Sequence, residues 1–196
     1  KMILSVMLLL SITTGCAAGE AKALSDSKGR MSLSQQIAKC NSKESAISIA
    51  ENGIEKIFGA NKYALEGDAS YNQDSSIQPD GWFVQLYDED WDYAVWITED
   101  KNRIHFVRGG EAHPLEFISE QEMKEIIESE EILDSAKALV AEQLRDDREI
   151  RDAYFDNTEE GAPHNSVDVT LVMEDGHIYM LTFYKDGTLR SLLYLE

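Results

Sequence analysis

One order of segments, a helix followed by four strands, occurs twice in this chain and restricts the folds open to it. Apolar residues at helical spacing predict the first helix at 44–58, with Ile47, Ala50, Ile54, Ile57 and Phe58 on one face. Tyr93, Val95 and Ile97 show the two-residue period that is typical of strands. The expected strands are 63–71, 82–87, 93–98 and 103–108 and, after a second helix at 134–146, 149–156, 166–173, 177–184 and 188–195.

The two halves also correspond in sequence around one strand and its turn. The stretch from Tyr93 to Asp100 aligns with the stretch from Tyr179 to Asp186, and both end in an acidic hairpin turn. We therefore expect an internal duplication, against the alternative that two strand pairs align by chance. The fold class predicted is α+β, with two tandem repeats that each pack a helix on a small antiparallel sheet of about three to four strands.

The expected organisation follows from these repeats and from the segments around them. It consists of a signal peptide at 1–15, a tether at 16–40, a first repeat at 41–110, a connecting segment at 111–133 and a second repeat at 134–196. The tether is rich in Ala, Ser, Gly and Lys, as flexible linkers are. In the connecting segment, Ser119 and Glu122 form a capping box that predicts a short acidic helix at 120–130.

The N-terminal residues read as an export signal. Lys1 is followed by an uncharged apolar run and then by Thr13-Thr14-Gly15-Cys16. A basic start, a short apolar core and small residues before a cysteine are typical of secretory signals. The ending resembles the lipobox of bacterial lipoproteins, which implies that Cys16 is lipidated and becomes the first residue of the mature chain. A plain secretory cut after Ala18 is the alternative.

The charge of the chain excludes some partners. The formal net charge is −19, and removing 1–15 takes away only Lys1, which leaves −20. A surface this acidic repels nucleic acid and anionic lipid headgroups, so membrane contact is expected only through a lipid on Cys16. Cys40 would then have no partner for a disulfide, which suits the surface of a Gram-positive bacterium.

Short motifs in both halves give the chain a resemblance to a known family. They are Gly81 to Val84, Tyr93 to Ile97 with Glu99-Asp100, and Tyr179 to Phe183 with Lys185-Asp186-Gly187. A helix followed by such strands resembles the PepSY-like family over 45–108 and 134–196. This resemblance implies an exported protein with a peptidase-inhibitory or binding role and without catalytic residues.

Motifs for catalysis or for cofactor binding are missing from the sequence. The four histidines stand apart from one another, and neither HExxH nor GxSxG occurs. Walker and GxGxxG loops are also missing. We therefore expect no catalytic residue, no metal and no cofactor.

The sharpest local feature is an acidic run with a tryptophan in it, Asp88-Glu89-Asp90-Trp91-Asp92. A solvated loop explains the run, although clustered carboxylates could also hold calcium. Trp91 either folds back onto the sheet, which we favour, or forms an exposed contact. The aromatic residues that crowd this half provide either core packing or a platform for a sugar or peptide. The candidate binding residues are Trp82, Asp88, Asp90, Trp91, Asp92 and Trp96.

These observations predict a lipoprotein on the extracytoplasmic face of a bacterial cell membrane. Its expected role is non-catalytic binding of a peptide or protein, with a peptidase as one such partner. A structural or sensory accessory subunit of a membrane complex is the first alternative, and an enzyme of unrecognised type is the second.

Overall fold

The computed structural model describes residues 31–73, 79–110, 114–156 and 164–196. Signal peptide 1–15, Cys16 and most of the expected tether lie outside the described residues. The folded unit begins at Ser32, within the range assigned to the tether. There α2 (Leu33–Ile37) packs on α3 (Lys43–Phe58) and buries Leu33 and Ile37.

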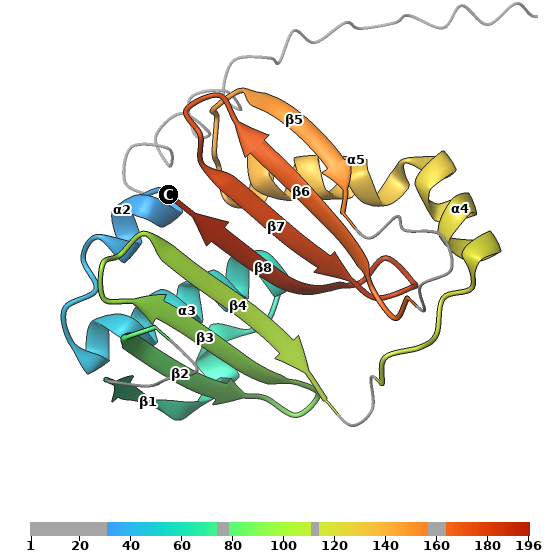
Figure 1. The fold of residues 1–196 in the computed structure, drawn as a ribbon. Coiled ribbons are helices and arrows are strands. Elements are labelled where there is room, and N and C mark those ends of the chain that lie inside the picture. Colours follow the sequence, from blue (N-terminus) through green and yellow to red (C-terminus); the bar gives the residue numbers. More distant parts are fainter. Residues whose placement is uncertain (1–30, 74–78, 111–113, 157–163) are drawn as a thin grey trace, which may run out of the picture. The chain divides into compact units, whose positions relative to one another are not determined.

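A single antiparallel sheet of eight strands dominates the fold (Figure 1). Its strands are β1 (Glu66–Asn72), β2 (Gly81–Tyr87), β3 (Asp92–Thr98), β4 (Arg103–Gly109), β5 (Ile150–Phe155), β6 (Val167–Met173), β7 (Ile178–Phe183) and β8 (Leu189–Leu195). They lie in the order β1-β2-β3-β4-β8-β7-β6-β5. Each predicted strand is therefore present, within a few residues of its expected bounds.

The predicted fold class, two repeats with a small sheet each, is wrong. Strands β4 and β8 pair from Arg103 with Leu195 to Val107 with Ser191, so the two halves share one continuous sheet. Pairing these strands removes two exposed edges, which would otherwise leave backbone groups without partners. The two-residue period assigns side chains to a face, but it does not identify the neighbour of each strand.

Capping residues define both ends of the first long helix and the start of the short acidic helix. Ser42 caps α3, and Gly59 ends it in the left-handed conformation at φ 73°. Ser119 and Glu122 form the expected capping box of α4 (Glu120–Ser129). The second long helix starts earlier than expected, as α5 (Glu131–Ala138), and continues into the π-helical turn η2 (Leu139–Gln143).

The helices that the structure describes cover the sheet on one face. Helix α3 contacts β1 to β4, and α5 contacts β5 and β6. The core between helices and sheet includes Ile54, Phe106, Leu181 and Leu192. In Figure 1, α3 and α5 lie behind the strands, and no described helix lies over the front. We call this uncovered side the open face.

Candidate functional site

The open face carries one row of side chains that runs across the whole sheet. Residues paired directly across neighbouring antiparallel strands project on the same side. Following the pairs gives Ser70, Phe83, Trp96, His105, Leu193, Met180, Thr170 and Tyr154, which we call the central row. Because this row crosses the β4–β8 junction, it exists only when the two halves share one sheet.

Three aromatic rings stack side by side in the central row. The ring centroids of Phe83 and Trp96 are 4.8 Å apart with an interplanar angle of 34°, and those of Trp96 and His105 are 5.7 Å apart at 31°. Both contacts are tilted, and together they form a continuous aromatic surface across β2, β3 and β4. The Nε1 atom of Trp96 is buried and has no hydrogen-bond partner among the described residues.

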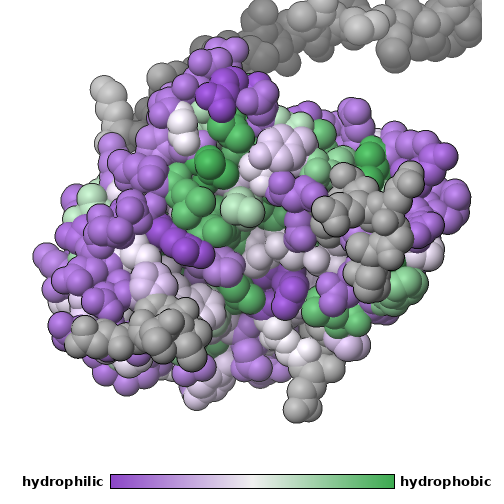
Figure 2. Space-filling view, viewed as in Figure 1, coloured by the Kyte–Doolittle hydropathy of each residue, from purple (hydrophilic) through white to green (hydrophobic). Residues whose placement is uncertain are grey.

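Apolar side chains continue the row over β7 and β8. Met180 is 39% exposed, and Leu193 beside it is half-buried. The adjacent pair Ile178 and Leu195 lies on the same side and is also half-buried. Figure 2 shows hydrophobic residues gathered on this face and surrounded by hydrophilic ones. An exposed apolar patch with a polar rim is typical of a binding surface.

The two middle strands of the sheet, β4 and β8, each carry one arginine close to His105, although the chain is strongly acidic. Burial, and then the charges of Arg103 and Arg190, lower the pKa of His105 from 6.5 to about 4. His105 is therefore neutral at pH 7, and both arginine charges are felt at its ring. In the described part of the chain, neither guanidinium group forms an ion pair.

The acidic side chains of this face lie toward the margins of the sheet. Asp68 lies on the edge strand β1, and Asp152 lies on the edge strand β5. Asp92 is the first residue of β3, and Asp168 lies on β6, next to β5. Among the described residues, these carboxylates thus lie on the outer strands or at a strand end, whereas the two arginines lie on the middle strands β4 and β8.

The acidic run 88–92 forms a compact hairpin loop held by its first residue. The carboxylate of Asp88 accepts hydrogen bonds from the backbone N–H groups of Asp90, at 3.0 Å, and Trp91, at 2.9 Å. It also accepts one from the Tyr93 hydroxyl at 3.1 Å. Burial, and then the charge of Asp88, raise the pKa of Tyr93. Among the described residues, no three His, Cys, Asp or Glu side chains come together in a metal-binding group.

Trp91 folds back onto the protein and does not form an exposed contact, which is the interpretation that the sequence favoured. The guanidinium carbon of Arg108 lies 4.5 Å from the Trp91 ring centre and 4.9 Å from that of Phe58. Arg108 Nε also donates a hydrogen bond of 2.5 Å to the carbonyl of Leu189. The tryptophan therefore covers a cation that is fixed between two aromatic rings.

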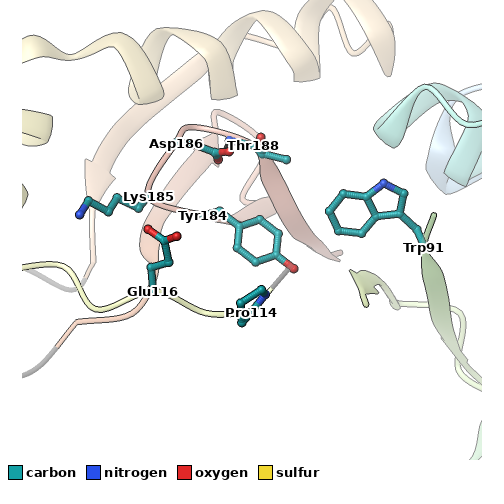
Figure 3. Close-up of a pocket in the computed structure, with 7 residues that line it drawn as sticks. All are labelled: Trp91, Pro114, Glu116, Tyr184, Lys185, Asp186 and Thr188. Atoms are coloured by element: carbon teal, nitrogen blue, oxygen red, sulfur yellow. Dashed lines mark hydrogen bonds between the residues drawn. The ribbon is translucent and has the colours of Figure 1, made fainter. Parts of the chain in front are cut away.

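Beside Trp91 lies a hollow of about 210 Å³ (Figure 3). It is lined by Trp91, Pro114, Glu116, Tyr184, Lys185, Asp186 and Thr188. The Trp91 ring lies in the loop before β3 and the Tyr184 ring directly after β7, with centroids 6.3 Å apart. Lys185, on its border, pairs with Glu122 at 2.7 Å and is not free to bind a ligand. The hollow is small for a ligand pocket.

A second polar cluster lies near the C-terminus, at a hollow of about 380 Å³. Arg148 pairs there with Asp146 and with Asp175, and the Tyr179 hydroxyl donates to Asp146 at 2.6 Å. Hydrogen bonds from Arg148, and secondly from His177, lower the pKa of Asp175 despite its desolvation. Since these charged groups already satisfy one another, we interpret the cluster as a link between η2, β6, β7 and the chain end.

The candidate binding residues predicted from the sequence do not form one site. Trp96 and Asp92 lie on the open face. Trp82 lies on the helix side, in an edge-to-face contact of 5.2 Å with Tyr71, and Trp91 covers Arg108. Sequence reasoning missed Arg103, His105, Arg190, Leu193 and Met180 as members of a common surface. Strand alternation is a signal that could have placed most of them on one face, but only the strand order makes them neighbours, and Arg190 lies at a register shift that alternation does not predict.

Comparison with models of protein families, with curated protein sequences and with solved structures finds no match for this chain. The resemblance to the PepSY-like family and the lipid on Cys16 therefore stay predictions.

Within the described residues, no helix is both long and apolar enough to cross a membrane. Cys40 is buried and forms no disulfide with a described residue, and its burial raises the pKa of the thiol.

Proposed function

We propose that this protein is a non-catalytic binding module that captures a peptide or protein on the open face of its sheet. A lipid on Cys16 would hold it on the extracytoplasmic side of a bacterial membrane. The central row is the observation that carries the proposal. It places contacting aromatic rings beside exposed apolar side chains on a face that no described helix covers. Surfaces of this composition are typical of protein interfaces.

The size of the open face suits a protein partner. Eight strands, spaced about 4.8 Å apart and about seven residues long, cover roughly 900 Å². A protein–protein interface of standard size buries about 800 Å² on each partner. The face is therefore large enough for a stable complex, and its partner could be a peptidase, as the PepSY-like resemblance implies.

Binding along a sheet edge, the other mode open to an antiparallel sheet, is less well supported. The edge strand β1 carries Glu66 and Asp68, and the edge strand β5 carries Arg151 and Asp152. A register shift between Ile150 and Asp152 also distorts β5. Charged side chains and bulges of this kind prevent a further strand from pairing. We therefore assign the binding to the face and not to the edges.

The test is capture of partners from native membranes by the wild-type protein and by Met180→Glu. Met180 is exposed at the centre of the face, so a charge there should abolish capture while thermal melting changes little. Tyr63→Glu is the matched control, because Tyr63 is 89% exposed and lies outside the sheet. Equal capture by all three proteins would refute the proposal. A partner retained in fixed stoichiometry would instead favour an accessory subunit of a membrane complex.

A further inference from the structure

We propose that the segment bound on the open face is acidic, with carboxylates that pair with Arg103 and Arg190 on either side of His105. This inference rests on the proposed function, because it describes the ligand of the same face. It runs against the overall charge of the chain. A net charge of −19 would by itself attract basic partners, whereas the local charge of the two arginines on β4 and β8 attracts acidic ones.

The positions of the two arginines define where the carboxylates would bind. Arg103 precedes His105 by two residues on β4, and Arg190 precedes Leu193, the cross-strand partner of His105, by three residues on β8. At about 3.3 Å per residue these separations are about 7 Å and about 10 Å along the strands. Arg190 is also the extra residue at a register shift between β7 and β8, which frees it from the regular ladder.

The chemistry of the face between the arginines favours a carboxylate. A guanidinium group binds a carboxylate through two parallel hydrogen bonds, and neither of these groups is occupied by an acidic side chain in the described part of the chain.

The apolar members of the row determine the rest of the ligand. Leu193 and Met180 continue the row beyond His105 and offer apolar contact without charge. His105 stays neutral at pH 7, so it adds neither repulsion nor a counter-ion. The ligand that fits is therefore a peptide segment in which acidic and apolar side chains alternate. An anionic bilayer is less suitable, because the acidic margins and the net charge repel it.

The experiment compares three short peptides in which Leu alternates with Glu, with Gln or with Lys, each labelled for fluorescence anisotropy. We expect the Glu peptide to bind most tightly, the Gln peptide less tightly and the Lys peptide least. Arg103→Gln and Arg190→Gln should each weaken binding of the Glu peptide by roughly tenfold and leave the Gln peptide nearly unchanged. Arg151→Gln is the matched control, because Arg151 pairs with Asp152 on the edge strand β5 and should change nothing.

The outcomes separate this inference from the proposed function. If the Glu and Gln peptides bind equally and Met180→Glu abolishes both, the open face binds peptides but the preference for acid is refuted. If the Lys peptide binds most tightly, net charge dominates and the inference is wrong. If no peptide binds, both proposals fail for extended ligands. Two further results would identify a different occupant and overturn the inference. One is tighter binding to vesicles that contain half phosphatidylglycerol than to neutral vesicles. The other is concentration-dependent self-association that is lost in Met180→Glu.

Discussion

The guanidinium carbon of Arg108 lies 4.5 Å from the centre of the Trp91 ring, which joins the acidic hairpin loop to the helix side of the sheet. Trp91→Ala removes this contact and exposes Arg108 and Phe58. We expect it to lower the free energy of unfolding by about 1–3 kcal/mol, because a half-buried aromatic ring and a cation–π contact are lost together. Urea unfolding measures the loss, and Tyr63→Ala, at an exposed site, should change it by less than about 0.5 kcal/mol.

The same variant separates packing from binding. Because Trp91 lies on the helix side, Trp91→Ala should retain peptide or protein capture by the open face under conditions where it is folded. Loss of capture with unchanged unfolding would show that Trp91 is a contact residue, contrary to this expectation.

Gly53 is required where α3 crosses the sheet. A Cβ atom at this position would lie 2.2 Å from a ring carbon of Phe106. We expect Gly53→Ala to destabilise the protein by about 1–3 kcal/mol, although alanine by itself favours the helix by about 1 kcal/mol. Adding Phe106→Leu should recover part of the loss, which a double-mutant cycle measures. Ser48→Ala, at an exposed position of α3, should be neutral or stabilising.

His105 should make stability depend on pH in a defined range. Its pKa falls from 6.5 to about 4 on folding, first because of burial and then because of Arg103 and Arg190. Between these values the unfolded chain binds more protons than the folded one, so the free energy of unfolding falls as the pH is lowered. After allowance for partial exposure the decrease is about 2 kcal/mol. Urea unfolding from pH 7 to pH 4 should show a smaller decrease in His105→Gln than in the wild type.

Arg148 links two carboxylates, and its removal should leave them without a counter-charge. The Asp146 side chain is only 8% exposed, so Arg148→Gln strands a nearly buried negative charge. We expect a loss of about 2–3 kcal/mol, less than for a fully buried pair because Arg148 is itself partly exposed. Arg151→Gln removes an exposed ion pair instead and should cost below about 1 kcal/mol. Equal losses in the two variants would contradict a structural role for the cluster.

Lipidation of Cys16 predicts a specific effect on location. Cys16→Ser should release the protein from the membrane fraction and remove the mass of the acyl groups. Fractionation followed by mass spectrometry of the intact chain tests this. Membrane association that persists without a lipid would show that another part of the protein provides the anchor.

Local structure could be predicted from local residues. Ser42, Gly59 and the pair Ser119 and Glu122 predict helix ends because capping depends on groups a few residues apart. The turn at Lys185-Asp186-Gly187 has the same local origin, and Gly187 adopts φ 81° there. Tyr93, Val95 and Ile97 alternate because one face of the sheet is buried, so the strand and its buried side follow from the sequence.

Tertiary structure alone decided which strands are neighbours, and this determined the site. Pairing of Arg103 with Leu195 and of His105 with Leu193 joins segments far apart in the chain, and no local residue specifies it. This pairing replaced two small sheets by one and aligned Trp96, His105, Leu193 and Met180 in a row. Long-range pairing depends on the burial of the whole sheet and on the removal of its edges, whereas capping and alternation depend on neighbours in sequence.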